Sequence, residues 1–199
     1  MRFVLASNNK GKLKEMREIL SELGIEVMSQ QEAGIASEPE EDGTTFEENA
    51  IIKARAAMEA SGLPAIADDS GIAVEALGGE PGIYSARYGD CNSDEERVEY
   101  LLKNMENEEH RAAKFVSSIA VAFPGGDVLT TIGECHGTLT YAPVGENGFG
   151  YDPIFYMEQF GRTLAQVSPE EKNGVSHRGR ALRAMKEKLT EYFKENNIC

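Results

Sequence analysis

The chain has 199 residues, of which 41% are hydrophobic and 27% are charged, values close to those of ordinary globular proteins. This length suits one domain, residues 1–199, and it excludes a chain that is disordered over most of its length. A net charge of −14 disfavours attraction to nucleic acid or to an anionic membrane, so a phosphorylated ligand needs local cations or a divalent metal ion.

The chain opens with a predicted strand, loop and helix. Residues 2–6 are apolar, and apolar residues then recur at helical spacing from Leu13 to Leu23, where Gly24 supplies a stop signal. The loop between them is polar and consists of Ser7, Asn8, Asn9, Lys10, Gly11 and Lys12. A helix N-terminus binds anions through its N–H groups, although a polar loop with a capping residue explains the same residues better on spacing alone.

An acidic, turn-like segment at residues 36–43 precedes the next predicted helix. It carries Glu40 and Glu41, either of which could bring a carboxylate to a metal site, although a solvated loop is the simpler interpretation. Thr45 and Glu48 have the spacing of a capping box, which predicts a helix that begins at Thr45.

A short apolar strand at residues 65–67 is predicted to end in Asp68, Asp69, Ser70 and Gly71. Ligands of α/β sheets bind beyond the carboxyl ends of strands. Two adjacent carboxylates there can hold a hard cation or accept a proton from water. An Asp-rich turn capped by Asp69 explains the same residues equally well.

The middle of the chain is predicted to hold a helix followed by a β-hairpin. Ser93 and Glu96 form a second capping box. Residues 113–123 and 127–139 look extended on either side of a Pro-Gly-Gly turn. Early alternation of strands and helices, with strands clustered later, predicts a mixed α/β sheet covered by helices.

A Gly- and Pro-rich irregular segment spans residues 141–153. Glycine and aromatic residues alternate there in the run Gly148, Phe149, Gly150, Tyr151 and Asp152. Glycine permits close approach of the backbone, and the rings offer faces for stacking on a base. We favour a binding function slightly over a loop that is merely anchored by two buried aromatic residues.

A last helix is predicted to start near Ser176. Lys172, His177 and Arg178 place cationic side chains close to its N-terminus. The helix dipole disfavours cations there, and an anionic ligand would relieve the repulsion. Three exposed side chains with Ser176 as the cap explain the same pattern.

Cysteine usage and hydropathy predict a cytoplasmic protein. Cys91, Cys135 and Cys199 form no CxxC pair, so neither a disulfide framework nor a zinc site is expected. The apolar run near the N-terminus is too short for a signal peptide, and no run reaches the ~20 apolar residues of a membrane span.

Taken together, these segments resemble the inosine triphosphate pyrophosphatase family over nearly the whole chain. The runs that carry the resemblance are ASNNKGK at 6–12, GTTFEENA at 43–50 with Lys53 and Ala54, ADDSG at 67–71, GGEPGIYSARY at 78–88, GFGYDP at 148–153 and SHRG at 176–179. One such run is a weak signal, but their succession in this order is specific. The family often has Thr and Gly at the positions of Ser7 and Asn8, and Ser retains the hydroxyl group.

The resemblance implies an α/β fold with an elongated mixed sheet flanked by helices, and two lobes with a central cleft. It also implies a homodimer that requires Mg²⁺. The implied reaction is the hydrolysis of non-standard purine nucleoside triphosphates (ITP, dITP and XTP) to the monophosphate and pyrophosphate. Such an enzyme cleanses the nucleotide pool.

The same resemblance implies roles for individual residues. Asp69 is implied as the proton acceptor and a metal ligand, and Glu40 as the second ligand, with the choice between Glu40 and the adjacent Glu41 left open. The implied contacts with substrate are made by Ser7, Asn8, Asn9, Lys10, Gly11 and Lys12 at the triphosphate, by Ser70, and by Phe149, Gly150, Tyr151, Asp152, Lys172, His177 and Arg178 around the base and sugar.

Two other functions remain open on the sequence. One is a pyrophosphatase that acts on pyrimidine or modified nucleoside triphosphates with the same metal site. The other is a nucleotide-binding protein without catalysis, against which the intact Asp69 argues.

Overall fold

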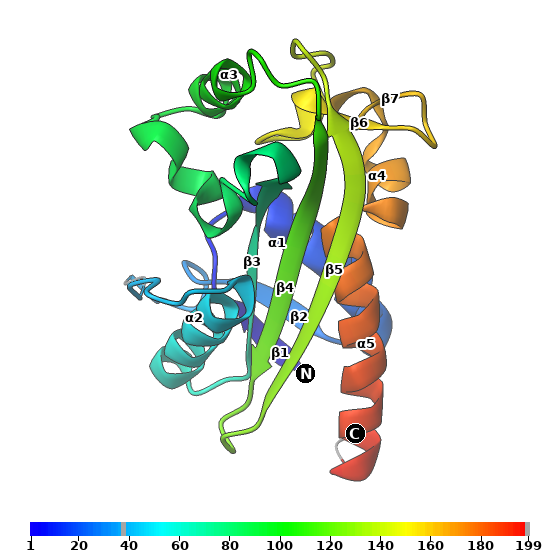
Figure 1. Cartoon of the computed structure of the whole chain (residues 1–199). Helices are drawn as coiled ribbons and strands as arrows, with labels where there is room; N and C mark the ends of the chain where they lie inside the picture. The colour runs from blue at the N-terminus through cyan, green and yellow to red at the C-terminus, as the bar shows by residue number, and fades with distance from the viewer. Residues whose placement is uncertain (37–38, 198–199) are drawn as a thin grey trace. The chain divides into compact units, whose positions relative to one another are not determined.

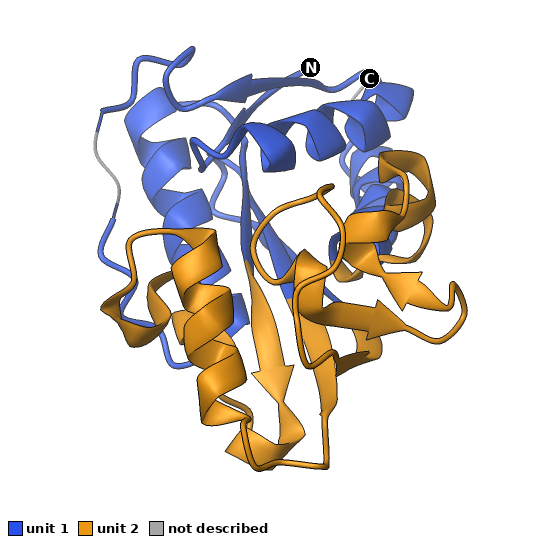
Figure 2. Cartoon of the chain, turned by 90° about the horizontal axis from the view of Figure 1, so that it is seen from above, with its two compact units in different colours: residues 1–69, 117–133, 178–199 blue, residues 70–116, 134–177 orange. Residues whose placement is uncertain are grey.

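The computed structural model describes residues 1–36 and 39–197 of the chain. Ser37 and Glu38 of the predicted acidic turn, and Cys199, lie outside the described residues. The chain forms two compact units: unit 1 contains residues 1–69, 117–133 and 178–199, and unit 2 contains residues 70–116 and 134–177 (Figure 2). The predicted division into two lobes is thus confirmed.

Seven strands form one mixed sheet in the order β2-β1-β3-β4-β5-β6-β7 (Figure 1). The strands are β1 (Arg2–Leu5), β2 (Glu26–Ser29), β3 (Ala65–Val74), β4 (Ala112–Ala122), β5 (Val128–Leu139), β6 (Phe155–Met157) and β7 (Arg162–Thr163). Strand β1 pairs in parallel with β2 and β3, whereas β6 pairs antiparallel with β5 and β7. The prediction of a mixed sheet is confirmed.

Helices flank the strands as the sequence predicted. The α-helices of the described residues are α1 (Lys10–Leu20), α2 (Phe46–Ser61), α3 (Asp94–Asn104), α4 (Pro169–Val175) and α5 (His177–Glu195). Only α4 was not predicted, although Ser168 and Glu171 form a reciprocal capping box at its start. Within the described part of the chain, no helix has the length and apolar character needed to cross a membrane.

The predicted capping boxes are half realised. Thr45 is the N-cap of α2, and its hydroxyl accepts a hydrogen bond from the N–H of Glu48 at 3.1 Å. The carboxylate of Glu48 accepts from the N–H of Thr44 at 2.7 Å rather than from that of Thr45. The same arrangement recurs at Ser93, so both helix starts are confirmed while the reciprocal bond falls one residue earlier.

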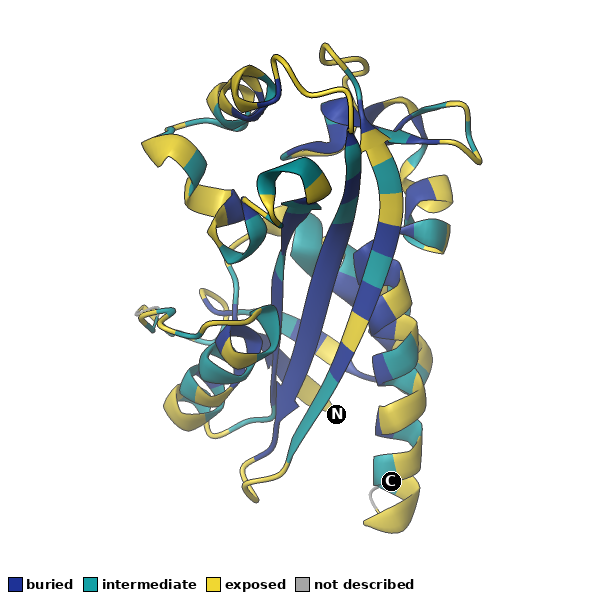
Figure 3. Ribbon diagram, viewed as in Figure 1, coloured by how far each residue is buried: buried dark blue, intermediate teal, exposed yellow. Residues whose placement is uncertain are grey.

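The alternation of side chains along the strands divides the core of unit 1 into two layers. On one face, residues such as Phe3 and Ile66 pack against α1 and α5. On the other face, residues such as Val4 and Ala67 pack against the alanines of α2. Buried residues accordingly run along both faces of the central strands, whereas the outer sides of the helices are exposed (Figure 3).

This alternation fixes the directions of the two adjacent carboxylates. Asp68 follows Ile66 at a spacing of two and therefore lies on the α1/α5 face. Asp69 follows Ala67 and lies on the α2 face. The two carboxylates therefore do not jointly hold one cation, as their adjacency in the sequence had allowed.

Strand β3 continues to Val74, so the prediction that it ends at residue 67 is wrong. Asp68 and Asp69 lie inside the strand, and the interpretation of an Asp-rich turn is wrong as well. Gly71 lies within the strand, and only glycine fits there because Ser85 packs directly on it: a Cβ at Gly71 would lie 2.3 Å from the Ser85 hydroxyl oxygen. The strand tolerates a buried carboxylate because Asp68 has long-range cationic partners, described below.

Unit 2 has its own hydrophobic core. Apolar residues of α3, such as Val98 and Leu101, pack there with residues of β3, β4, β5 and β6. The rings of Phe115 and Phe155 lie 4.5 Å apart between centroids. Residues 141–151 contain no helix or strand, as predicted, but the end of the predicted irregular segment 141–153 is wrong, because Asp152–Ile154 forms a 3₁₀ helix.

Candidate active site

Asp68 is a fully buried anion on the α1/α5 face of unit 1. Its carboxylate accepts hydrogen bonds from Arg178 Nε at 2.8 Å and from the Ser117 hydroxyl at 2.8 Å, and lies 3.1 Å from Lys12 Nζ. Burial opposes ionisation, but Arg178 and Lys12 outweigh it and hold the pKa of Asp68 well below its ordinary value. Asp68 therefore stays ionised at neutral pH.

Arg178 completes a balanced group of four charges. Its side chain is 2% exposed, and Nη1 lies 2.7 Å from Glu15 Oε2. Arg178 and Lys12 contribute two positive charges, and Asp68 and Glu15 contribute two negative charges, so the formal sum is zero. Arg178 is thus paired with two carboxylates, those of Asp68 and Glu15. Its expected contact with a base stays a prediction.

The polar loop before α1 is organised by Asn9. Its side-chain Oδ1 accepts from the N–H groups of Gly11 at 2.9 Å and of Lys12 at 3.1 Å. The N–H of Asn9 donates in turn to the Ser7 hydroxyl at 3.1 Å. The capping interpretation of this loop is confirmed, and two N–H groups that were expected to bind phosphate are already satisfied.

The cations of this loop differ in their surroundings. Lys12 Nζ also donates to the carbonyl oxygen of Asp68 at 3.1 Å, and burial lowers the pKa of Lys12 despite its ion pair with Asp68. Lys10 and Asn8 are exposed. Lys10 is thus the lysine of the loop that offers its charge to solvent.

Asp69 lies on the α2 face in a cluster of different composition. Its Oδ1 lies 2.6 Å from Lys53 Nζ, and the same ammonium lies 3.4 Å from Glu41 Oε1. The other oxygen, Oδ2, is buried and accepts no hydrogen bond from the described residues. Burial raises the pKa of Asp69, and Lys53 offsets this only in part.

Asp69 and Glu41 fit a hard divalent cation. Two carboxylates share one lysine, so the formal charge of the cluster is −1, and a buried oxygen of Asp69 still needs a positive partner. No three Asp, Glu, His or Cys residues converge on a metal site within residues 1–36 and 39–197. Mg²⁺ is commonly bound by only one or two carboxylates together with substrate phosphates and water.

The structure brings Glu41 rather than Glu40 into this cluster. Glu40, the ligand implied by the resemblance, is exposed, whereas Glu41 is half-buried beside Lys53. The sequence does not separate the two neighbours because the path of an irregular loop decides which carboxylate turns inward.

Lys53 belongs to the residues that carry the resemblance, but it was not assigned a role in the site. It lies on α2 three residues after Ala50 and four before Ala57, both of which are buried. A lysine on the buried stripe of a helix is a signal that could have identified it, because such a charge needs a buried partner.

In unit 2, the run of alternating glycine and aromatic residues at 148–152, here called the Gly–aromatic loop, lies next to Lys172. Asp152 Oδ2 accepts from the N–H of Phe149 at 3.0 Å and lies 2.5 Å from Lys172 Nζ. The Lys172 ammonium also lies 4.6 Å from the centroid of the Phe149 ring, which is a cation–π contact. Lys172 and Asp152 are buried, whereas Phe149 is 37% exposed.

The loop presents one aromatic face rather than two. Tyr151 is buried, and its hydroxyl donates to the carbonyl oxygen of Ser85 at 2.8 Å, so this ring anchors the loop. The expectation that a base stacks on Tyr151 is wrong, because neither face of its ring is exposed. Gly148 has φ +77°, and a Cβ there would lie 2.1 Å from Asp152 Oδ2, so only glycine fits. Phe149 is therefore the aromatic side chain that the loop offers to a ligand.

His177 and Ser70, two further residues predicted to contact substrate, lie in unit 2. His177 is buried in unit 2 and stacks on Phe115, with centroids 4.8 Å apart and an interplanar angle of 14°. Ser70 is half-buried in β3, directly after Asp69. Their contacts with substrate stay predictions.

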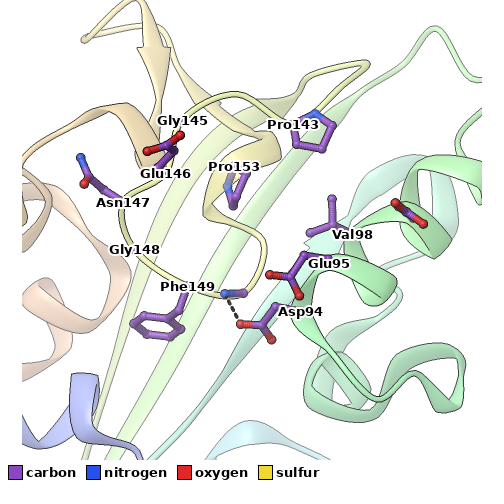
Figure 4. A pocket seen from close by; sticks show the side chains of 12 residues that line it. Asp94, Glu95, Val98, Pro143, Gly145, Glu146, Asn147, Gly148, Phe149 and Pro153 are labelled. Carbon is purple, nitrogen blue, oxygen red and sulfur yellow. Dashed lines mark hydrogen bonds between the residues drawn. The ribbon is translucent and has the colours of Figure 1, made fainter.

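A cavity of about 400 Å³ lies between the Gly–aromatic loop and α3 (Figure 4). Its lining includes Asp94 and Val98 of α3 and Phe149 and Pro153 of the loop. Volumes of this order hold small organic ligands in other proteins.

Comparison with known proteins identifies the family. The Ham1 family profile matches residues 3–188. The chain is 48% identical over 189 residues to a dITP/XTP pyrophosphatase of Thermus thermophilus, covering 94% of this chain and 91% of that protein. It is 50% identical over 196 residues to a protein of the same name from Symbiobacterium thermophilum, covering 98% of each. The solved structure of a HAM1 protein from Coxiella burnetii is similar with a TM-score of 0.88 and 44% identity, over 96% of this chain and 99% of that one. This chain therefore belongs to the Ham1 family.

Proposed function

We propose that this chain is a nucleoside-triphosphate pyrophosphatase that hydrolyses dITP, ITP and XTP to the monophosphate and pyrophosphate, with Mg²⁺ as its cofactor. Proteins of that activity by name are 48% and 50% identical to it over nearly its whole length. The observation that carries the proposal is Asp69, a buried carboxylate with a raised pKa and one oxygen without a hydrogen-bond partner among the described residues.

Asp69 is suited to accept the proton of an attacking water molecule. Lys53 holds Oδ1, which leaves the two lone pairs of Oδ2 for the water and for the cation described next. A carboxylate whose pKa is raised towards neutrality is a better general base than an ordinary one. The water then forms a bond to the α-phosphorus, its proton passes to Asp69, and the bond to the leaving pyrophosphate breaks.

Asp69 and Glu41 would hold the Mg²⁺ ion, with Glu40 as the alternative ligand that the resemblance implies. When bound, Mg²⁺ neutralises phosphate oxygens and lowers the pKa of water. The negative formal charge of the Asp69, Glu41 and Lys53 cluster supports this assignment. Lys10 supplies exposed positive charge near the N-terminus of α1 for the phosphates. The contact that the resemblance implies for Lys12 would require this lysine to share its charge with Asp68.

The choice between the two acidic neighbours is open to a direct test. Glu41→Gln is expected to raise the Mg²⁺ concentration for half-maximal activity by roughly tenfold or more, because it removes a charged ligand. Glu40→Gln, the matched control, is expected to change it by less than about twofold because its side chain is exposed. Titration of activity with Mg²⁺ measures both. A larger effect of Glu40→Gln would make Glu40 the ligand and overturn the assignment to Glu41.

Base selection is proposed to depend on hydrogen-bond donors directed at a 6-oxo group. Phe149 offers an exposed ring for stacking, and Lys172 lies against that ring. His177 and Arg178 are the further donors implied by the resemblance. Adenine carries a 6-amino group, and buried donors that face it lose their partners, which discriminates by roughly 10⁴-fold in other enzymes.

We also propose that the protein is a cytoplasmic homodimer. The free thiols of Cys91 and Cys135 suit a reducing compartment. The homodimer is what the resemblance implies.

A substrate panel tests the proposed function. In the presence of Mg²⁺, kcat/KM for dITP and XTP is expected to exceed that for dATP by roughly 100-fold or more, and a chelator is expected to abolish turnover. Both the monophosphate and pyrophosphate are quantified. Equal rates on pyrimidine triphosphates would favour a pyrophosphatase that acts on pyrimidine or modified nucleoside triphosphates. Binding without turnover would favour a nucleotide-binding protein without catalysis. Release of orthophosphate would mean a different reaction.

A further inference from the structure

Asp94 ties helix α3 to the Gly–aromatic loop within unit 2. It is the first residue of α3, and its Oδ2 accepts a hydrogen bond from the N–H of Gly150 at 2.8 Å (Figure 4). Its other oxygen, Oδ1, lies 2.5 Å from Arg97 Nη2. Burial opposes ionisation of Asp94, but the bonds from Arg97 and Gly150 prevail and lower its pKa, so the acceptor is charged.

A second carboxylate holds the neighbouring peptide group. Asp152 accepts from the N–H of Phe149 at 3.0 Å and is itself paired with Lys172 at 2.5 Å. Two successive N–H groups of the loop are therefore bound by two carboxylates from different parts of unit 2. Hydrogen bonds to ionised acceptors are roughly twice as strong as those between neutral groups.

The loop needs such restraint because of its own sequence. Gly148 and Gly150 flank Phe149 and have φ of +77° and +60°, a region that glycine enters freely and other residues rarely adopt. Two glycines give the backbone on either side of the ring many alternative conformations. The carboxylates select one of them, in which the Phe149 ring points away from Asp94 and lies against the Lys172 ammonium.

We propose that Asp94 is a positioning residue for base recognition: by holding Gly150 it fixes the Phe149 ring in the orientation that stacks on the purine. The inference rests on the proposed function, because it takes Phe149 as the stacking face. Asp94 acts through the loop and does not itself contact substrate.

A substitution of the neighbouring residue Glu95 distinguishes a positioning role of Asp94 from a general effect of charge on helix α3. Glu95 also lies in the first turn of α3, where an acidic side chain interacts favourably with the helix dipole. The N–H of Gly150 is bonded to Asp94. Glu95→Ala therefore removes one negative charge from the same turn and serves as the matched control for Asp94→Ala.

Steady-state kinetics test the proposal. Asp94→Ala is expected to raise KM for dITP roughly tenfold with little change in kcat, because a charged hydrogen bond that orders a binding loop is lost. Asp94→Asn keeps an oxygen that can accept from Gly150 and is expected to recover most of the affinity. Glu95→Ala is expected to stay near the parent enzyme. If KM for Asp94→Ala equals that for Glu95→Ala, the proposal is overturned.

A spectroscopic measurement reads the loop without substrate. The chain contains no tryptophan, so Phe149→Trp introduces a single tryptophan at the ring itself, which can be excited selectively at wavelengths that tyrosine does not absorb. In this background Asp94→Ala is expected to lower the fluorescence anisotropy, Asp94→Asn to restore it, and Glu95→Ala to leave it unchanged. Identical anisotropy in all variants would overturn the positioning role. Absence of dITP hydrolysis by the parent enzyme would instead refute the proposed function and leave this measurement valid.

Discussion

Replacing Asp69 by asparagine is expected to lower the turnover of dITP by roughly 10²–10⁴-fold, the range that general bases contribute. Asparagine is nearly isosteric but cannot accept the proton of the attacking water. The loss should appear in kcat as well as in kcat/KM, because the proton is transferred only in the reaction itself. Release of pyrophosphate in saturating Mg²⁺ measures the effect.

The same substitution is expected to leave the free energy of unfolding unchanged or to raise it. Burial raises the pKa of Asp69, which means that the fold disfavours its ionised form. A neutral side chain removes that penalty. A variant that loses activity because it unfolds would contradict this account, and thermal denaturation separates the two cases.

The raised pKa of Asp69 also sets the direction of the pH dependence. The base works only when ionised, so kcat/KM should fall on the acid side at a pH above the ~3.9 of an ordinary aspartate. A profile measured at a Mg²⁺ concentration well below saturation tests this direction, because bound Mg²⁺ would itself lower the pKa of Asp69. An acid limb at or below the ordinary value under these conditions would contradict it.

Replacing Asp68 by asparagine is expected to destabilise the protein by about 3–5 kcal/mol, the cost of leaving buried cations without their partner. Arg178 and Lys12 would face Glu15 alone, so the buried group would carry an excess positive charge. Typical domains are stable by only about 5–15 kcal/mol, so the change removes a large share of the total. The midpoint of urea denaturation measures it.

The neighbouring variant, Asp69→Asn, is the matched control for Asp68→Asn, because both make the same chemical change in the same strand. A destabilisation of less than about 1 kcal/mol in Asp68→Asn would show that Arg178 and Lys12 do not depend on this carboxylate.

The lowered pKa of Asp68 predicts how the free energy of unfolding depends on pH. Its folded-state pKa lies below the unfolded value of ~3.9, so its contribution to stability is complete above that value and is lost as pH falls through the folded pKa. The parent protein should therefore lose stability in acid more steeply than Asp68→Asn. Equal slopes of unfolding free energy against pH below about 4 would contradict this.

Local signals predicted much of the fold. The periodicity that ends at Gly24 matches α1 and its following turn, and Thr45 and Ser93 cap the helices that they were expected to cap. The end of β3 was not predictable in this way. Asp68 is tolerated inside the strand because Arg178, 110 residues away in the sequence, reaches it, and no local pattern reveals such a partner.

The site was predictable in its residue types and less so in its arrangement. The runs around Asp69, Phe149 and Lys172 were identified from the sequence. The division between Asp68 and Asp69 depends on which face of β3 each carboxylate occupies, and this becomes clear only when the strand is seen to continue. The inclusion of Glu41 and Lys53 depends on how α2 and the preceding loop pack on that strand.

The most direct test of the account is hydrolysis of dITP in water enriched in a heavy isotope of oxygen, with the products analysed by mass spectrometry. Attack at the α-phosphorus by the water that Asp69 deprotonates predicts that the label enters the monophosphate and that the pyrophosphate carries none. Label in the pyrophosphate, or in orthophosphate, would contradict the account.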